Sequence, residues 1–348
     1  MNVAIVNDSR AAAEVLRRIL TQLPGFDLLW TAYSGEEAVR LAAATRPDII
    51  LMDLIMPGID GAETTRRIMQ ASPCVVLVVT ATTTGNRNLV FEAMGHGALD
   101  AVNTPTVGLS GDLGGAEPLL QKLRTVARLV SPLQTPGSHL ASSIRHAARH
   151  TPDLSALAIV AIGASTGGPQ ALSRVLSALP PNFPAAVLVA QHVDEHFAPG
   201  LAAWLQHHSP LPVRIARHGE PVAPHTVYLA GSKDHLIYVE PEGDQPPVLH
   251  YTPCPRETPY RPSVDALFAS LAEPHRAPRV GVLLTGMGRD GAEGLLALRQ
   301  SGALTIAQDA PTSVVFGMPK AAIELKAAAE VLAIDAIGPR IRNAILHP

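Results

Sequence analysis

The chain has 348 residues, which at roughly 150 residues per domain predicts two domains. Only 16% of its residues are charged and the net charge is −3, which excludes a polyelectrolyte tail and a generally basic nucleic-acid-binding protein. Hydrophobic residues make up 47% of the chain, but aromatic residues only 4%. The cores are therefore expected to be built from Ala, Val, Leu and Ile, as in α/β layers, and no aromatic platform for single-stranded nucleic acid is expected.

The first residues lack a basic segment and reach a carboxylate at Asp8, so they do not have the form of a signal peptide. No uncharged apolar run approaches the roughly 18 residues that a membrane span needs. Cys74 and Cys254 have no CxxC partner, which predicts neither a disulfide framework nor a structural zinc site. We expect a cytoplasmic protein that does not insert directly into a membrane.

In the first third of the chain, short apolar runs alternate with amphipathic segments of helical periodicity. Runs that are apolar throughout are typical of a parallel sheet covered by helices on both faces. The predicted strands are Val3–Val6, Asp48–Met52, Val75–Val79 and Leu99–Val102, and the predicted helices are Arg10–Leu23, Gly35–Thr45, Ala62–Gln70 and Glu117–Val130. Ser9, Ser34 and Asp60 or Gly61 precede the first three helices, where capping residues are expected.

A linker is predicted over residues 126–153, between domains at 1–125 and 154–348. The segment contains Pro132, Pro136 and Pro152 and little apolar periodicity. No acidic residue lies between Pro118 and Pro152, whereas five basic residues do: Lys122, Arg124, Arg128, Arg145 and Arg149. We interpret this stretch as a solvated hinge, and a docking strip for an acidic partner is the alternative.

The last part of the chain predicts a second α/β domain. Its apolar runs are Ala156–Ile162, Ala185–Ala190, Val227–Ala230, Val280–Leu284 and Leu304–Ala307. Its predicted helices are Gln170–Leu179, Ala198–Gln206, Val264–Leu271 and Ala292–Gln300. A hairpin is expected from His235–Glu240 and Val248–Tyr251. The predicted class is thus α/β, with two doubly wound, mostly parallel sheets.

Two carboxylates are expected at one edge of the first sheet. Asp8 follows the first strand and Asp53 the third, and Thr80 follows the fourth. Ligands of such sheets gather at the carboxyl ends of the strands, and carboxylate oxygens suit Mg²⁺. A metal-held aspartate can also be a nucleophile toward phosphorus. The alternative is that each carboxylate only caps a neighbouring helix.

A candidate nucleophile, base and acid follow three strands of the second sheet. Ser165 lies in Gly-Ala-Ser-Thr-Gly-Gly-Pro, which fits G-x-S-x-G and opens a helix. His192 follows the next strand, and Asp290 lies in the glycine-rich loop Thr-Gly-Met-Gly-Arg-Asp-Gly after a later one. A serine needs a base and the base an orienting acid. A glycine turn that binds phosphate or simply packs is the alternative.

Two other kinds of site fit parts of the second domain's sequence. His192 to His196 fits the zinc-binding pattern H-x-x-E-H, but zinc ligation requires both histidines on one helical face, and His192 directly follows a strand. The strand, glycine turn and helix also suggest a dinucleotide site, although the glycine spacing is not G-x-G-x-x-G. Both are weaker interpretations than a serine hydrolase.

The first domain resembles the receiver domains of two-component response regulators. The words that carry the resemblance are Asn-Asp-Ser at 7–9, Leu-Met-Asp-Leu-Ile-Met-Pro-Gly at 51–58 and Val-Thr at 79–80. The resemblance implies that Asp53 is the phosphoacceptor, that Asp8, Asp53 and the Ile55 carbonyl ligate Mg²⁺, and that Thr80 contacts the phosphoryl group. The chain departs from the family pattern at Asn7, Ala101 and Thr104, where a second acidic residue, an aromatic residue and a lysine are usual.

The whole chain resembles the chemotaxis protein-glutamate methylesterases, the CheB family. The receiver is followed by GASTGGP, QHV, TGMGRDGAEG and QDAPTSVVFGMP in the family's order. The N-terminal words, with MDLIMP, SPC at 72–74 and VFEAMGHGALD at 90–100, look most like the Wsp-type branch of surface-sensing systems.

The resemblance implies hydrolysis of glutamate γ-methyl esters on the cytoplasmic part of a chemoreceptor, with deamidation of glutamine as a related reaction. Ser165 would be the nucleophile, His192 the base and Asp290 its orienting acid, and the backbone at Thr166 and Met287 would hold the oxyanion. No cofactor is expected at this site.

Regulation is also implied: phosphoryl transfer from a CheA-like histidine kinase to Asp53 would relieve inhibition by the receiver. The alternative is a catalytically degenerate regulator that binds receptor or kinase and competes for phosphate.

Overall fold

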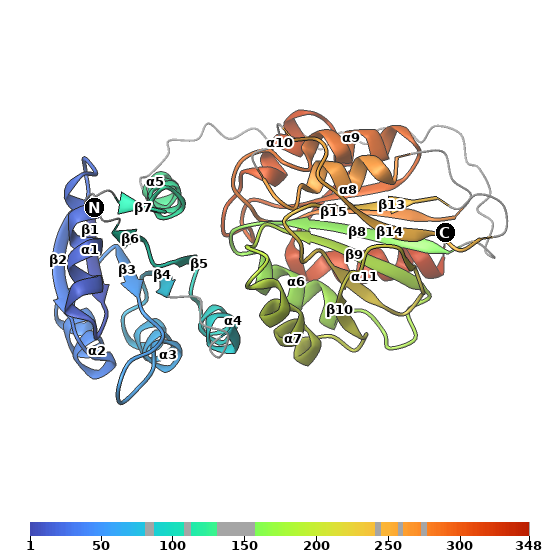
Figure 1. Ribbon diagram of the computed structural model, residues 1–348. Helices are drawn as coiled ribbons and strands as arrows, with labels where there is room; N and C mark the ends of the chain where they lie inside the picture. The colour runs from blue at the N-terminus through green and yellow to red at the C-terminus, as the bar shows by residue number, and fades with distance from the viewer. Residues whose placement is uncertain are drawn as a thin grey trace. The chain divides into compact units, whose positions relative to one another are not determined.

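The computed structural model describes residues 1–80, 87–107, 113–130, 157–240, 245–256, 260–272 and 277–347. The chain forms two compact units, Met1–Ser138 and His139–Pro348 (Figure 1). Residues 131–156, which contain most of the predicted linker with Arg145 and Arg149, lie outside the described residues. Of the basic residues before them, Lys122 pairs with Asp100 and Arg124 with Glu117.

The first unit is a five-stranded parallel sheet in the order β2-β1-β3-β4-β5. Its strands are β1 (Asn2–Val6), β2 (Asp27–Ala32), β3 (Ile49–Met52), β4 (Val75–Thr80) and β5 (Asp100–Asn103), and its helices are α1 (Arg10–Thr21), α2 (Gly35–Ala44), α3 (Gly61–Ala71), α4 (Arg87–Gly95) and α5 (Glu117–Val130). A small antiparallel pair, β6 (Thr106–Val107) and β7 (Leu113–Gly114), completes the unit. The doubly wound sheet expected from the sequence is confirmed.

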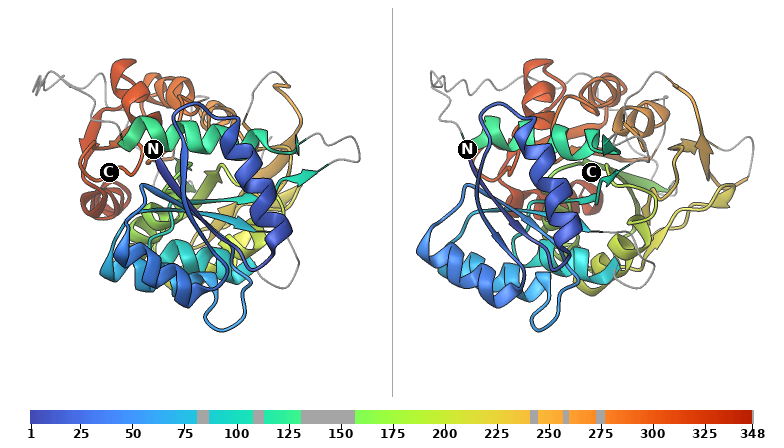
Figure 2. Two further views of the ribbon diagram at one scale, coloured as in Figure 1. Left: turned by 90° about the vertical axis from the view of Figure 1, so that its left-hand side faces the viewer. Right: turned by 60° about the vertical axis from the view of Figure 1, so that its left-hand side comes forward.

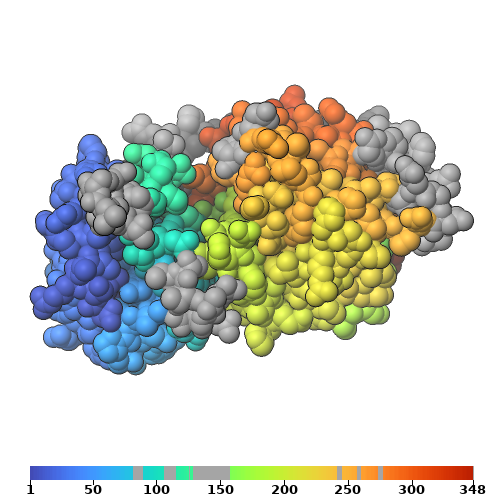
Figure 3. All heavy atoms as spheres, viewed as in Figure 1, coloured from blue at the N-terminus to red at the C-terminus, as the bar shows by residue number. Residues whose placement is uncertain are grey.

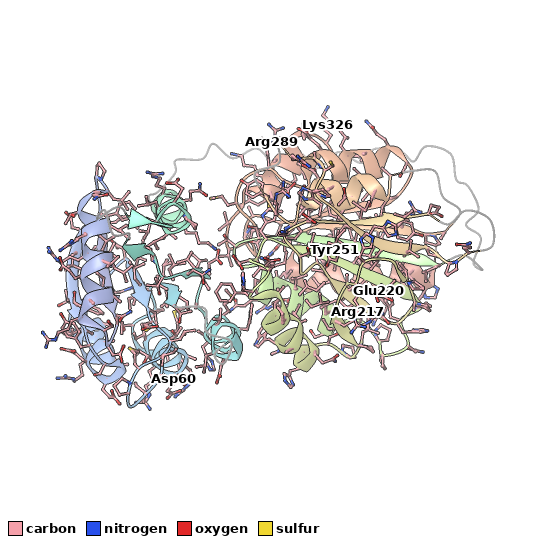
Figure 4. The ribbon with its side chains drawn as sticks, viewed as in Figure 1. Asp60, Arg217, Glu220, Tyr251, Arg289 and Lys326 are labelled. Carbon is pink, nitrogen blue, oxygen red and sulfur yellow. The ribbon has the colours of Figure 1, made fainter. Side chains whose placement is uncertain are left out.

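Helices cover both faces of this sheet. Apolar side chains of α1 and α5, such as Leu16 and Leu123, share one core with Ile5 and Leu51 of the sheet. The rotated views show α2 and α3 on the opposite face (Figure 2). Capping residues fix where these helices begin: Asp60, labelled in Figure 4, accepts the Glu63 N–H at 2.8 Å, and Ser9 and Ser34 cap α1 and α2 as predicted.

The second unit is built on a seven-stranded parallel sheet in the order β10-β12-β9-β8-β15-β16-β17. Its strands are β8 (Ala158–Ala164), β9 (Ala185–Gln191), β10 (Val213–Ile215), β12 (Val227–Leu229), β15 (Arg279–Leu283), β16 (Leu304–Gln308) and β17 (Glu330–Leu332). A three-stranded antiparallel sheet contains β11 (Glu220–Pro221), β13 (His235–Val239) and β14 (Val248–Thr252). The predicted hairpin is the β13–β14 pair.

Six helices cover the second sheet: α6 (Gly168–Ser177), α7 (Ala198–His208), α8 (Val264–Ser270), α9 (Ala292–Gln300), α10 (Met318–Glu324) and α11 (Ile334–Leu346). Side chains of α8, α9 and α10, including Phe268, Leu295 and Met318, share one core with Leu188 of the sheet. In Figure 1 these helices lie above the sheet and α6, α7 and α11 lie below it. The residues between α7 and α8, yellow to orange in Figure 3, form much of the surface that this unit turns to the viewer.

Several elements were not predicted. Strand β2, at the sheet edge, has two exposed and three half-buried residues before its one buried residue, so it lacks a continuous buried run. Pro319 at the start of α10 and Pro339 inside α11 obscure the helical pattern of those segments. No helix in the described part of the chain is long and apolar enough to span a bilayer. Cys74 and Cys254 are free thiols, as expected.

Candidate active site

The ends of three neighbouring strands bring the predicted serine, histidine and aspartate to one edge of the second sheet. Ser165 follows β8, His192 follows β9, and Asp290 lies beyond β15, which pairs with β8 on its other side. The Ser165 N–H donates to the Thr285 carbonyl at 3.0 Å, and the His192 N–H donates to the Ala164 carbonyl at 3.0 Å. These ladder-like bonds continue the pairing past the strands and hold the three loops together.

His192 and Asp290 form a direct hydrogen-bonded pair. The distance from His192 Nε2 to Asp290 Oδ2 is 2.7 Å, and both side chains are largely buried. Because the carboxylate can only accept, Nε2 carries the proton and Nδ1 carries the lone pair of the neutral imidazole. Nδ1 is buried and has no hydrogen-bonding partner within the described residues. The imidazole is therefore held in the tautomer whose Nδ1 is the basic atom.

Three further donors converge on the Asp290 carboxylate. The Ser263 hydroxyl donates to Oδ1 at 2.9 Å, the Val264 N–H donates to Oδ2 at 2.7 Å, and the Asp265 N–H donates to Oδ1 at 3.0 Å. Burial of Asp290 opposes its ionisation, but the hydrogen bonds from His192 and these amides outweigh burial and lower the pKa of Asp290 to about 2. Asp290 is thus a fixed anion beside the imidazole.

The turn that carries Ser165 requires glycine at two places, one within the turn and one in the loop that packs against it. Gly167 has a φ of +78°, in the left-handed region, and is the N-cap residue before helix α6. An added Cβ at Gly286 would lie 2.7 Å from the Ser165 Cβ. The Gly286 carbonyl accepts the N–H groups of Gly317 and Met318 at 3.1 and 2.9 Å. The glycine-rich loop after β15 therefore lies directly against the serine, and its backbone is fixed there.

Of the two predicted oxyanion residues, one is next to Ser165 in the sequence and the other lies in the loop packed against it. Thr166 follows Ser165, and its carbonyl accepts the Thr285 hydroxyl at 3.0 Å. Met287 follows Gly286, the glycine packed against Ser165. Their role as donors to an oxyanion stays a prediction.

Three residues that support this site were not predicted. The Gln191 side chain donates to the His192 carbonyl, Tyr260 stacks on the His192 ring, and Ser263 donates to Asp290. Ser263 could have been found as the capping residue before a predicted helix, since it caps α8. Tyr260 had no local signal, because its contact with His192 joins positions far apart in the sequence.

The predicted carboxylate site of the first unit lies at the ends of β1, β3 and β4. Asp8 is exposed, and Asp53 is half-buried with its Oδ1 accepting the Leu54 N–H at 2.7 Å. Burial raises the pKa of Asp53, and the negative charge of Asp8 contributes. The Thr80 hydroxyl is buried, and its interaction with the Asp53 carboxylate acts in the opposite direction, lowering that pKa.

Of the departures from the receiver pattern, Asn7 has a structural role that depends on its side chain, whereas Thr104 contributes a backbone hydrogen bond. The Asn7 side chain is buried, and its Oδ1 accepts the Ser9 N–H at 2.9 Å, so it fixes the start of α1. The Thr104 N–H donates to the Thr80 carbonyl at 3.1 Å. The described residues contain no cluster of three His, Cys, Asp or Glu side chains suited to a metal.

The alternative zinc pattern is not assembled. His192 follows β9 and is bonded to Asp290, whereas His196 lies in the turn before α7 with its Nδ1 2.6 Å from Asp194. The two histidines do not share a helical face, because α7 begins at Ala198. A metalloprotease site of this kind is therefore excluded for these two residues.

Comparison with known proteins gives matches for both units. A family model described as CheB methylesterase matches residues 160–341, and one described as response regulator receiver domain matches residues 3–106. The chain is 50% identical over 345 residues to protein-glutamate methylesterase/protein-glutamine glutaminase 1 of Cupriavidus pinatubonensis, covering 99% of this chain and 97% of the relative. A counterpart numbered 2 in Cupriavidus metallidurans is 51% identical over 341 residues, covering 98% and 97%.

A solved structure is also similar. The crystal structure of the Thermotoga maritima CheB methylesterase catalytic domain matches with a TM-score of 0.52 and 37% sequence identity, covering 54% of this chain and 98% of that domain.

Proposed function

The chain belongs to the CheB methylesterase family, with a receiver domain that regulates the methylesterase domain, and we propose that Ser165, His192 and Asp290 perform its hydrolysis of glutamate γ-methyl esters. The observation that carries this assignment is the 2.7 Å bond between His192 and Asp290 at the strand ends next to Ser165. The substrate would be the cytoplasmic part of a methylated chemoreceptor. A cytoplasmic location follows from that substrate.

In this mechanism the Ser165 Oγ attacks the ester carbonyl carbon and His192 Nδ1 takes the serine proton. The imidazolium then returns that proton to the methoxide oxygen, so methanol leaves and a glutamyl-serine ester remains. Water attacks this ester with His192 again as base, which releases the glutamate and restores the serine. Asp290 stabilises the imidazolium, as its lowered pKa indicates.

We propose that the Thr166 and Met287 backbone N–H groups hold the oxyanion of the tetrahedral intermediates. Loss of one such donor typically raises the barrier by about 3 kcal/mol. The same steps with ammonia as leaving group would deamidate glutamine, the second activity in the names of the Cupriavidus relatives. No step of either reaction requires a cofactor at this site.

The first test replaces the nucleophile. Ser165→Ala is expected to abolish methanol release from a methylated receptor fragment, because no other group in the mechanism forms the acyl intermediate. Ser173→Ala is the matched control, since Ser173 lies on α6 and its hydroxyl only donates to the Gln170 carbonyl. If Ser165→Ala released methanol at the wild-type rate, the catalytically degenerate regulator would be the better description.

For the receiver we propose that Asp53 accepts a phosphoryl group from a CheA-like histidine kinase. The carboxylates of Asp8 and Asp53 and the Ile55 carbonyl are oxygen donors of the kind that Mg²⁺ prefers, and they would hold the ion. Bound Mg²⁺ would neutralise charge on the phosphoryl oxygens. The buried Thr80 hydroxyl interacts with the Asp53 carboxylate, and this proximity supports its role as a donor to the phosphoryl group.

The finer features remain proposals. The wording of residues 7–8, 52–57, 72–74 and 90–100 supports assignment to the Wsp-type branch that serves surface sensing. The proposed domain limits are 1–125 and 154–348. Helix α5 runs to Val130, so the linker would begin within that helix.

A further inference from the structure

Tyr260 contacts the catalytic base, although nothing in the mechanism above uses it. The rings of Tyr260 and His192 are parallel, with an interplanar angle of 0° and centroids 4.6 Å apart. His192 is thus constrained at two places: Asp290 holds Nε2, and the tyrosine covers one face of the ring. The hydrogen bond at Nε2 restrains the position of one ring atom, whereas a stacked ring also restrains the plane of the imidazole.

The Tyr260 ring is itself held against the glycine-rich loop. Gly288 has a φ of +83°, and an added Cβ there would lie 2.6 Å from the Tyr260 hydroxyl oxygen. The tyrosine hydroxyl therefore lies in space that only a glycine leaves open. Since Gly288 is next to Met287, Tyr260 connects the base with the loop proposed to hold the oxyanion.

The chain on both sides of Tyr260 is anchored by one buried histidine. His235 Nε2 lies 3.0 Å from the Pro255 carbonyl, and the Ser263 N–H donates to His235 Nδ1 at 3.0 Å. His235 has no exposed surface. Ser263 in turn donates its hydroxyl to Asp290. The same anchor thus fixes the tyrosine over the base and the serine against the acid.

We propose that Tyr260 is a positioning residue for His192, which rests on the proposed roles of Ser165, His192 and Asp290. Its ring sets the plane of the imidazole so that Nδ1 keeps its direction. The negative face of the aromatic ring also favours the imidazolium that forms each time the base takes a proton. Both effects need an aromatic ring at this position and neither needs the hydroxyl.

The test compares Tyr260→Phe, which keeps the ring, with Tyr260→Leu, which removes it, in the full-length protein. The first measurement is the rate at which a fluorophosphonate labels Ser165, since this reaction needs the base but no receptor. Tyr260→Leu should label about tenfold more slowly, because small misplacement of a catalytic group is costly, and Tyr260→Phe should label within about twofold of wild type. With methylated receptor, kcat should fall in Tyr260→Leu while KM stays nearly constant.

A structural role alone is separated by a matched control and by a spectroscopic measurement. Tyr251→Leu removes another half-buried tyrosine of the same unit, on β14 (Figure 4), whose hydroxyl accepts the Gly231 N–H at 2.9 Å, and it should label at the wild-type rate. The NMR ring-current shift of the His192 ring protons should persist in Tyr260→Phe and disappear in Tyr260→Leu.

Labelling of Tyr260→Leu at the wild-type rate would overturn the proposal, as would equal slowing in Tyr260→Leu and Tyr251→Leu. Absence of methanol release from wild type would instead refute the proposed substrate, while the labelling rates would still decide the role of Tyr260.

Discussion

Gln191 is the residue that joins the nucleophile to the base through the backbone. Its side-chain N–H group donates to the Ser165 carbonyl at 2.8 Å and to the His192 carbonyl at 3.1 Å, and the residue is only 3% exposed. An added Cβ at Gly168 would collide with the Gln191 amide oxygen, so the amide also fills the space under the serine turn. One buried amide therefore holds the two loops whose relative position the reaction depends on.

Gln191→Leu should accordingly lower kcat for methanol release by about tenfold or more, because the two carbonyls lose the amide that joins them and the loops can separate. Thr305→Val is the matched control, since Thr305 lies on β16 and its buried hydroxyl also bonds two backbone groups. It donates to the Ala327 carbonyl at 2.7 Å and accepts the Ala329 N–H at 3.0 Å. The effect would be measured by steady-state kinetics of the variants. Thermal unfolding curves that match the wild-type curve would show that the variants are folded. Equal kcat in the two variants would show that Gln191 contributes to stability alone.

At the scale of elements, the start of helix α8 supports the acid of the triad. Its first N–H groups, at Val264 and Asp265, donate to Asp290, and the N-terminus of a helix favours negative charge. The Asp265 carboxyl accepts the Gly294 N–H at 2.7 Å and joins α8 to α9. Burial raises the pKa of Asp265 to about 6, opposed by that hydrogen bond and reinforced by the charge of Asp290.

This arrangement predicts a pH-dependent effect of Asp265→Asn. A carboxyl whose folded pKa is raised destabilises the folded state increasingly as pH rises from about 4 to 6, because the unfolded chain ionises first. The asparagine removes this effect and keeps an oxygen for the Gly294 N–H. The free energy of unfolding should therefore be about equal in the two proteins at pH 4 and about 1 kcal/mol higher for Asp265→Asn above pH 6, with solvent screening included.

Urea unfolding followed by Trp204 fluorescence in a Trp30→Phe background reports on the unit that contains α8. A stability difference that is independent of pH between 4 and 8 would contradict the role assigned to the Asp265 charge.

The sequence predicts the elements best where one local pattern decides them. The uniformly apolar strands β1, β3, β4, β8 and β9 were found because they are buried on both faces. Strand β2 was not, because only its last residue is buried, and α11 was not, because it contains Pro339. The three proposed triad residues could be expected at one sheet edge because each follows a predicted strand. Tyr260 was missed because only tertiary folding brings it to His192.

For the whole molecule, the receiver makes phosphorylation the expected control of hydrolysis. Phosphorylation of Asp53 should raise methanol release several-fold in the full-length protein. Asp53→Asn, which cannot form the acyl phosphate, should release methanol at the same rate with and without the phosphodonor. The measurement is methanol release from methylated receptor before and after incubation with kinase and ATP. Identical rates in the wild-type protein would contradict the regulation and leave the esterase assignment intact.

The order of strands in the second sheet determines where this enzyme can tolerate insertions and deletions. Ser165 follows β8, which lies between β9, followed by His192, and β15, followed by Asp290. The side chains of His192 and Asp290 therefore bridge two strand spacings, roughly 10 Å, past the end of β8 to form their 2.7 Å hydrogen bond. An inserted residue at that end would push the serine turn into this bridge. Natural insertions and deletions should therefore collect at the outer strands β10 and β17, while the length of the β8–α6 connection stays constant.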